Sequence, residues 1–224
     1  MKINHEGHED LSTTKATKVT KKTNVASCSS LLRGLFLFVV VASASVVGAG
    51  TTWRATQGDV RIMCPLTIGG SFQAKTAALS GSLTPDASHP PSDGGRFVVD
   101  LRTLDTGINL RNEHLREKYL EVDKAPGYDT ATLSEIDLKG VNPDSPQGKG
   151  SFTGALMLHG TKKTVSGPAE IRKAGSGLRV KASFPVNLSD FAIPEPRYLG
   201  VGVKNTVQVE VTFTASPAAA TPTR

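Results

Sequence analysis

Apolar and polar residues alternate in the second half of the chain, and this pattern predicts antiparallel strands with one buried face. In segment 178–186 every second residue, from Leu178 to Val186, is apolar, and Arg, Lys, Ser or Pro stands between them. Segment 206–214 repeats the pattern, with Val or Phe at each odd-numbered position from 207 to 213. In a strand, a period of two places the apolar side chains on one face, which can then pack against a core.

Other strand candidates are shorter or less regular, and turn signals rich in Gly, Pro and Asp separate them. They cover residues 59–64, 71–76, 78–83, 96–104, 130–138, 151–159 and 162–173. About eight strands at even spacing, with no long helical period, predict an all-β antiparallel barrel or sandwich. We favour an eight-stranded barrel, because the same strands in an open arrangement would leave sheet edges exposed.

Segment 104–122 breaks this pattern and predicts a short helix after about the fourth strand. The turn residues Asp105, Thr106 and Gly107 open it, and Leu, Arg, Glu and Lys, which favour helices, then replace the alternation. Its chemically versatile side chains are Arg111, Glu113, His114 and Arg116. They form either an acid–base cluster or a solvated helix face whose ion pairs contribute under about 1 kcal/mol each.

Composition divides the chain into four parts. Residues 1–33 are polar and rich in Lys, Thr and Ser, which predicts a disordered basic head. Residues 34–52 contain no charged side chain and include a strongly apolar run. The barrel domain is expected over residues 53–215, and the Pro- and Ala-rich residues 216–224 are expected to form a disordered tail.

The uncharged segment 34–52 has two interpretations, both of which place the barrel outside the cytoplasmic membrane. Its strongly apolar part is as short as the h-region of a cleaved signal peptide, and basic residues precede it. Its full length is also sufficient to span a bilayer as an uncleaved anchor. We therefore expect a periplasmic or secreted protein, or one anchored to the cytoplasmic membrane and facing outward.

Charge and motifs exclude several classes of function. The chain has 26 Lys and Arg against 20 Asp and Glu, with no basic block in the barrel domain, so nucleic-acid binding is not indicated. No HExxH, CxxC, GxSxG or Walker pattern occurs, and we expect no catalytic residue, metal site or cofactor. Cys28 and Cys64 lie on opposite sides of the apolar segment, so no internal disulfide is expected. The oligomeric state stays open, a homodimer included.

The apolar strand faces point instead to a binding function. A small eight-stranded barrel can hold one small ligand, and an aliphatic and aromatic interior suits a hydrocarbon. The alternative is an interior that is simply a filled core. The residues expected to line the interior are Phe97, Val99, Leu101, Leu115, Leu156, Leu158, Leu178, Val180, Phe184, Val209 and Val211.

Three stretches, in order and at the right spacing, resemble the YceI-like family. The first, 100–122, contains the family's DTG, then R, then EHLR, followed by a hydrophobic pair. The second, LMLHGTKKTV at 156–165, is close to the family's L-x-L-H-G-V-T-K-P-V. The third, NLSDFAI at 187–193, is similar to N-R-S-D-F-G-I. The resemblance covers most of residues 59–215.

This resemblance implies an exported, lipocalin-like barrel that binds a long-chain amphiphile such as a polyisoprenoid, and a binding protein rather than an enzyme. Within such a barrel, Arg111, His114 and Arg116 would meet a polar or phosphate head group, or would only fasten the helical segment to the barrel. The membrane would be a second partner if the segment 34–52 is not cleaved.

The sequence departs from the family at several positions, and two other functions stay open. Met63, Cys64 and Pro65 stand where the family often has a Lys-His pair inside a strand, and Ala192 replaces the usual glycine. One alternative is an envelope or stress-response module with a filled core. The other is an enzyme on the same barrel that uses His114 or His159 as an acid–base group.

Overall fold

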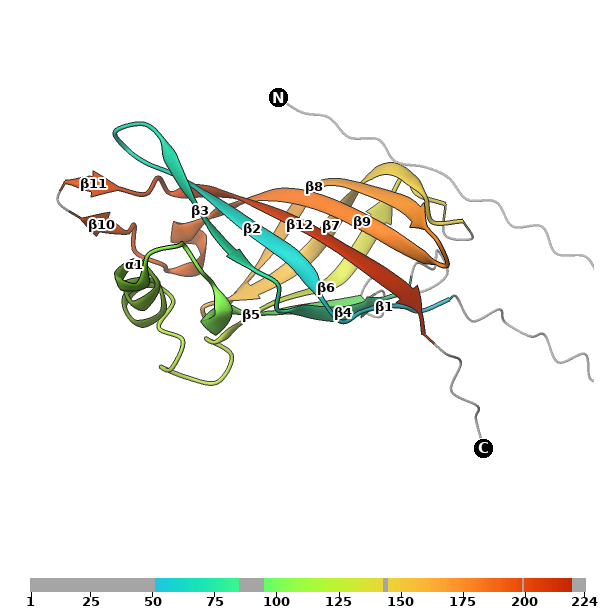
Figure 1. Ribbon diagram of the computed structural model, residues 1–224, viewed down its shortest axis with the longest axis horizontal. Helices are drawn as coiled ribbons and strands as arrows, with labels where there is room; N and C mark the ends of the chain where they lie inside the picture. The colour runs from blue at the N-terminus through green and yellow to red at the C-terminus, as the bar shows by residue number, and fades with distance from the viewer. Residues whose placement is uncertain (1–50, 85–94, 143–144, 199, 219–224) are drawn as a thin grey trace, which may run out of the picture. The chain divides into compact units, whose positions relative to one another are not determined.

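The computed structural model describes residues 51–84, 95–142, 145–198 and 200–218, and strands dominate these ranges (Figure 1). Ten of the strands form one antiparallel sheet. They are β1 (Trp53–Ala55), β2 (Gly58–Pro65), β3 (Ser71–Thr76), β4 (Leu79–Leu83), β5 (Gly95–Asp100), β6 (Thr130–Lys139), β7 (Gly148–Leu158), β8 (Thr161–Ala174), β9 (Gly177–Asn187) and β12 (Thr206–Pro217). Two short strands, β10 (Arg197–Tyr198) and β11 (Val201–Gly202), pair separately.

The sheet closes on itself through β12. One edge of β12 pairs with β9, and the other edge pairs with β2 and then with β1. Thus β1 and β2 are successive parts of one barrel strand, and β3 and β4, which pair with them, are successive parts of the next. Since β4 also pairs with β5, the described strands form a closed antiparallel barrel of eight strands, which confirms the predicted fold class.

Three element boundaries differ from those predicted. Segments 71–76 and 78–83, expected as separate strands, are two halves of one barrel strand, so the helix follows the third barrel strand. Strand β12 continues to Pro217, two residues into the expected tail, because Ser216 and Pro217 pair with β1 and complete the barrel. Strand β2 ends at Pro65, one residue beyond the predicted segment 59–64, and a proline is tolerated at this last position.

The parts predicted to precede the barrel lie almost entirely outside the described residues. None of the basic head 1–33 is described, and of the segment 34–52 only Thr51 and Thr52 are. Within the described ranges, no helix is long and apolar enough to cross a membrane.

The predicted alternation determines which side of each strand is buried. In β9, Val180, Phe184 and Val186 are buried, whereas Arg179 and Lys181 are exposed. Strand β12 repeats this arrangement, with Val207 and Phe213 buried and Glu210 exposed. The inward face of the barrel is therefore apolar on both strands, as a period of two requires when one side faces water.

Three connections gather at one end of the barrel, and we call them together the collar (Figure 1). They are the β2–β3 turn at 66–70, the connection 101–129 between β5 and β6, and the connection 188–205 between β9 and β12. Backbone hydrogen bonds join the first and the third, from Thr67 N to Gly202 O at 2.8 Å. The second is joined to the third where Arg197 N donates to the Tyr119 hydroxyl at 3.3 Å.

The collar contains all the helical turns of the described chain. The 3₁₀ turn η2 (Leu101–Thr103) is followed by α1 (Asn109–His114) and by a π-helical turn, Leu115–Tyr119. A second 3₁₀ turn, η4 (Leu188–Phe191), follows β9. The helix expected within 104–122 is therefore confirmed.

We call the opposite end the base. Here β1 meets the end of β12, and the Phe97 and Phe213 rings pack with their centroids 4.8 Å apart. Ile171, only 1 % exposed, lies in the same apolar cluster. The base is thus built as an ordinary hydrophobic core.

Candidate ligand-binding cavity

A cavity of about 810 Å³ occupies the barrel interior, within the range of roughly 300–1,000 Å³ typical of small-molecule sites. Apolar side chains from the barrel strands, β1 excepted, line it. At the base its lining residues, such as Ile171 and Phe213, are buried. At the collar, Ile108 and Leu110 also line it, yet they are 49 % and 54 % exposed. The cavity therefore opens at the collar.

Ten of the eleven residues predicted to line the interior lie along this cavity. They are Phe97, Val99, Leu101, Leu115, Leu156, Leu158, Val180, Phe184, Val209 and Val211. The eleventh, Leu178, is buried but packs in the apolar cluster of the base and does not line the cavity. It pairs with Ala215 near the end of β12, beyond the part of β9 that lines the cavity, which begins at Val180.

Sequence reasoning missed much of the wall contributed by β6. Leu133, Ile136 and Leu138 all line the cavity, although strict alternation cannot put odd and even positions on one face. The pairing with β7 shifts register between Ser134 and Asp137, and Glu135 adopts a positive φ of 53°. Such a bulge inserts one residue and changes the phase of the strand, so a pattern search finds no signal there.

The DTG signature positions α1 through one buried amide. Asn112, 6 % exposed, donates from Nδ2 to Asp105 Oδ1 at 2.8 Å. Its Oδ1 accepts from Thr106 N at 2.8 Å and from Thr106 Oγ1 at 2.7 Å. The bond from Asn112, and then that from Gly107 N, lower the pKa of Asp105. Every polar atom of the Asn112 side chain thus contacts the turn, and the helix is held at a fixed place over the barrel mouth.

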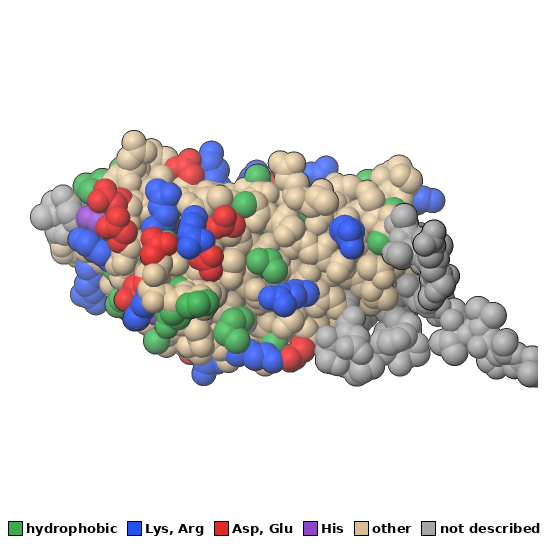
Figure 2. Space-filling view, turned by 90° about the horizontal axis from the view of Figure 1, so that it is seen from below, with side chains coloured by type: hydrophobic (Ala, Val, Ile, Leu, Met, Phe, Trp, Pro, Cys, Tyr) green, Lys and Arg blue, Asp and Glu red, His purple; other side chains and the backbone are tan. Residues whose placement is uncertain are grey.

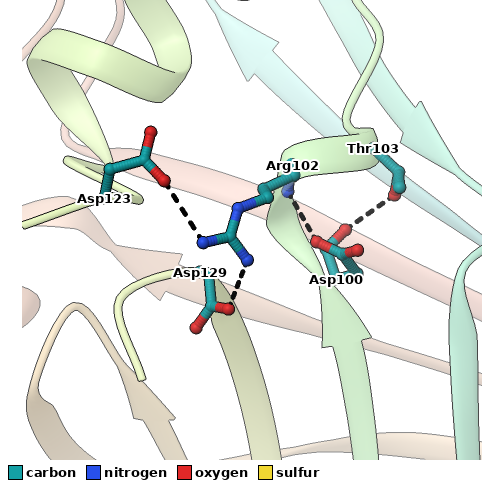
Figure 3. A network of polar contacts seen from close by, with 5 residues as sticks. All are labelled: Asp100, Arg102, Thr103, Asp123 and Asp129. Atoms are coloured by element: carbon teal, nitrogen blue, oxygen red, sulfur yellow. Dashed lines mark hydrogen bonds and ion pairs between the residues drawn. The ribbon is translucent and has the colours of Figure 1, made fainter. Parts of the chain in front are cut away.

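Arg102 joins the start of the connection 101–129 to its end (Figure 3). Its guanidinium donates to Asp129 and, at 3.2 Å, to Asp123, and these bonds raise the pKa of Arg102. Its backbone N donates to Asp100 Oδ1 at 2.9 Å, so η2 is capped by the last residue of β5. The two carboxylate partners of its guanidinium lie 27 and 21 residues away in sequence, so no local sequence pattern predicts these contacts.

The three polar residues predicted to meet a head group separate into two sets. Arg111 and His114 line the cavity, and Arg116 does not. Arg116 instead donates from Nε to Asn112 O at 3.1 Å and from Nη1 to Arg102 O at 2.9 Å. Arg116 therefore fastens the helical segment, which was the second of its two predicted roles.

Arg111 lies at the mouth with its hydrogen-bond donors available. Its guanidinium stacks over the Phe72 ring of β3, 4.3 Å from the ring centre. Among the described residues no carboxylate or other acceptor pairs with it, and Arg197, which sequence reasoning missed, lines the same opening. His114 Nε2 lies 3.4 Å from Lys118 Nζ rather than beside a carboxylate. The mouth therefore presents Arg111, a cation without a described acceptor, beside an apolar interior.

His159 is buried beneath the collar, 7 % exposed, and does not line the cavity. Its Nδ1 lies 3.0 Å from Phe191 O, and its Nε2 lies 3.0 Å from Glu121 Oε2. Lys124 first, and then His159, lower the pKa of Glu121 by donating to its carboxylate. His159 thus joins the β7–β8 turn to both flanking connections.

Neither a metal site nor a reactive thiol is found in the described part of the chain. No group of three or more His, Cys, Asp or Glu side chains there could hold a metal ion. Cys64 is unpaired with another cysteine, lines the cavity wall, and has its pKa raised by burial to about 11. A thiol of that pKa stays protonated near neutral pH and is a poor nucleophile.

Comparison with known proteins identifies the family. The YceI-like domain matches residues 39–215, which is most of the chain and all of the barrel except the last two residues of β12. The chain belongs to the YceI-like family. A UPF0312 protein of Pseudomonas paraeruginosa is 32 % identical over 120 residues, which cover 50 % of this chain and 59 % of that protein. One from Vibrio vulnificus is 29 % identical over 135 residues, covering 57 % and 68 %. The chain thus spans little more than half the length of the first of these relatives.

Solved structures share the fold at low sequence identity. A polyisoprenoid binding domain from Saccharophagus degradans, implicated in plant cell wall breakdown, superposes with a TM-score of 0.57 at 15 % identity, covering 75 % of this chain and 99 % of that domain. BcnA of Burkholderia cenocepacia superposes with a TM-score of 0.52 at 18 % identity, covering 70 % and 96 %. At these identities the likeness establishes the barrel fold of the YceI-like proteins.

Proposed function

We propose that this protein binds a long-chain amphiphile, with the hydrocarbon chain inside the barrel and the head group at the collar. The observation that carries the proposal is the cavity, which is apolar along its length and opens beside the unpaired guanidinium of Arg111. A cavity of this size favours a ligand over the alternative of a filled core. The polyisoprenoid-binding neighbour of the same fold supports the choice of a lipid.

The size of the cavity suggests the size of the ligand. At about 30 Å³ per molecule, the 810 Å³ would hold roughly 27 waters. A methylene group is close to water in volume, so we expect on the order of 25 chain atoms to be enclosed. Because each buried methylene contributes about 0.8 kcal/mol, a chain of this length provides ample affinity without specific polar contacts. A longer ligand would extend through the mouth.

The rim is suited to an acidic or phosphorylated head group. Arg111 presents guanidinium hydrogens that no described residue uses, and planar guanidinium groups bind carboxylate and phosphate in pairs of hydrogen bonds. Arg197 lies at the same opening, and its Nη2 donates to Glu195 at 3.1 Å. We assign Arg111 as the principal head-group contact and His114 as a secondary one.

The two histidines support binding rather than catalysis. An acid–base enzyme needs a histidine that faces substrate and has a partner that orients it. His114 lines the cavity, but its ring lies beside the ammonium of Lys118 rather than beside a carboxylate. His159 has a carboxylate partner, but both its nitrogens are engaged and it lies outside the cavity. Neither meets both requirements.

We further propose that the protein carries this ligand outside the cytoplasmic membrane. The uncharged segment 34–52, preceded by basic residues, supports export or outward anchoring. An exported barrel would keep an insoluble chain shielded from water between membranes or between enzymes.

The direct test is to extract the purified full-length protein with organic solvent and identify amphiphiles by mass spectrometry. The matched control is Ala182→Phe, because Ala182 lines the cavity and an added ring would fill it. We expect a long-chain amphiphile to copurify with the natural protein and to be depleted from the variant, with circular dichroism unchanged. Equal lipid content in both, or none in either, would refute the proposal.

Arg111→Ala tests the head-group assignment, with Arg116→Ala as its control. For a fluorescent long-chain fatty acid, loss of Arg111 should weaken binding about tenfold or more, since hydrogen bonds to a charged group contribute about 1.5–3 kcal/mol and 1.4 kcal/mol is tenfold. The corresponding alcohol should bind equally to both proteins. Arg116→Ala should lower stability, because it removes two bonds to backbone carbonyls, and should leave fatty-acid affinity unchanged.

A further inference from the structure

The exposed large apolar side chains of the described residues are concentrated on the collar. Ile68, at the tip of the β2–β3 turn, is 72 % exposed, and Ile108 and Leu110, at the start of α1, are 49 % and 54 % exposed. Met157, on the outer face of β7, is 38 % exposed. Exposed apolar residues that occur together, rather than singly, mark a surface that contacts a protein or a membrane.

These side chains continue the apolar lining of the cavity to the surface. Ile108 and Leu110 belong to the cavity wall and to the exposed surface at once. Leu66, two residues before Ile68, lines the cavity as well, and Thr67 between them is bonded to β11 across the mouth. An unbroken apolar path therefore runs from the exposed rim to the base of the barrel.

The charge of the collar around these residues is close to balanced. Over 105–119 three acidic and three basic side chains cancel, and 194–205 contributes one net positive charge. Figure 2 shows hydrophobic side chains lying among both signs of charge toward the end that carries α1. A partner attracted by apolar contact, rather than by charge, fits such a surface.

We propose that the collar docks on the surface of a lipid bilayer, with Ile68, Ile108 and Leu110 inserted among the acyl chains. The inference rests on the proposed function, because a bilayer is both the source of a long-chain ligand and an apolar phase that can meet the cavity mouth. Insertion joins the two apolar phases, so a chain can move between bilayer and cavity without crossing water. A protein docked on the same rim would instead cover this opening and block the passage of a chain through it.

The test uses full-length protein carrying a nitrobenzoxadiazole probe on a cysteine introduced at Leu110, in a Cys28→Ser background. Cys64 is buried, and its pKa of about 11 keeps it from reacting at neutral pH. The matched control is the same probe at Met157, an exposed apolar residue on the barrel wall. Because both proteins retain the segment 34–52, any attachment through that segment is common to them.

On addition of phosphatidylcholine vesicles, the probe at Leu110 should shift its emission to shorter wavelength and brighten several-fold, and the probe at Met157 should not change. Added salt should leave the shift intact, because the collar is nearly neutral. Ile68→Ser, at an exposed residue that does not line the cavity, should weaken the shift while lipid still copurifies, which separates docking from ligand binding. An unshifted probe at Leu110, or a shift produced by a soluble protein fraction and not by vesicles, would overturn the proposal.

Discussion

The base and the collar of the barrel are held together by different kinds of interaction. At the base, apolar side chains such as Ile171 and Leu178 pack together in one buried cluster. At the collar, charged and amide side chains such as Arg102 and Asn112 hold the connection 101–129 in place beside an opening. Burial stabilises the base, and it depends mainly on the size and shape of the apolar side chains. Hydrogen bonds and ion pairs stabilise the collar, and they depend on the particular residues that form them.

The backbone shows the same division. Residues in the left-handed conformation at the base, Gly140 and Gly175 among them, are glycines. Three of the four non-glycine residues with positive φ in the described chain belong to the collar or to the β7–β8 turn beneath it: Glu121, His159 and Ala192. A left-handed L-residue costs about 1–2 kcal/mol, and such cost is commonly retained where function fixes the geometry. We therefore expect apolar burial at the base to contribute most of the stability, and residue-specific bonds and backbone conformations at the collar to fix the geometry of the opening.

Ile171→Ala should have the largest effect on stability. The side chain is 1 % exposed in the apolar cluster of the base, and removing a buried Ile in this way costs about 2–5 kcal/mol. Ile68→Ala is the matched control at the collar, where 72 % exposure predicts a change within about 0.5 kcal/mol. Urea unfolding of both variants measures the difference. Equal losses would contradict the division between base and collar.

Asn112→Ala should come next, with a loss of about 1–3 kcal/mol, because it leaves the Asp105 carboxylate and the Thr106 donors without their partner. Asn109→Ala, on the exposed first turn of α1, serves as the control. Hydrogen exchange should additionally show faster exchange over 105–119 in the first variant, with β9 and β12 unchanged. If hydrogen exchange instead became equally faster in all strands of the barrel, the bonds of Asn112 would not act on α1 alone.

Ala192→Gly should stabilise the protein slightly. Ala192 has φ of 54°, and glycine removes the left-handed cost of about 1–2 kcal/mol while adding about 0.5–1 kcal/mol of chain entropy. We expect a gain of up to about 1 kcal/mol in urea unfolding. Ala174→Gly, at an exposed strand end without positive φ, should instead destabilise the protein. A loss in both variants would mean that the conformation at 192 carries no strain.

Glu121→Gln should give the smallest change and one that depends on pH. Bonds from Lys124 and His159 hold the pKa of Glu121 below its ordinary value in the folded protein. A lowered folded pKa stabilises the protein above the unfolded pKa, and this contribution is lost as pH falls through the folded value. The variant should therefore be less stable near neutral pH, and the difference should disappear in acid, below about pH 4. Thermal unfolding across pH measures the difference, with Glu113→Gln, on the exposed face of α1, as the matched control.

The candidate site was predictable to the extent that it depends on strand alternation. For Val180, Phe184, Val209 and Val211 the period of two alone places the side chain on the cavity wall. The pattern fails for Ile136, because the bulge at Glu135 shifts the phase of β6. It also fails for Leu178. Alternation predicts which face of the sheet a side chain occupies, but it does not predict where along the barrel axis the cavity ends.

The sequence by itself determined the barrel, its apolar interior and the presence of a charged helical connection, because these follow from local periodicity and turn chemistry. Only the tertiary structure decided that Arg111 faces the mouth while Arg116 faces the backbone of η2. The same holds for His159, whose partners lie 32 and 38 residues away. A helix of one or two turns has no periodic signal strong enough to fix its rotation, so the contacts that fix it come from distant segments of the chain.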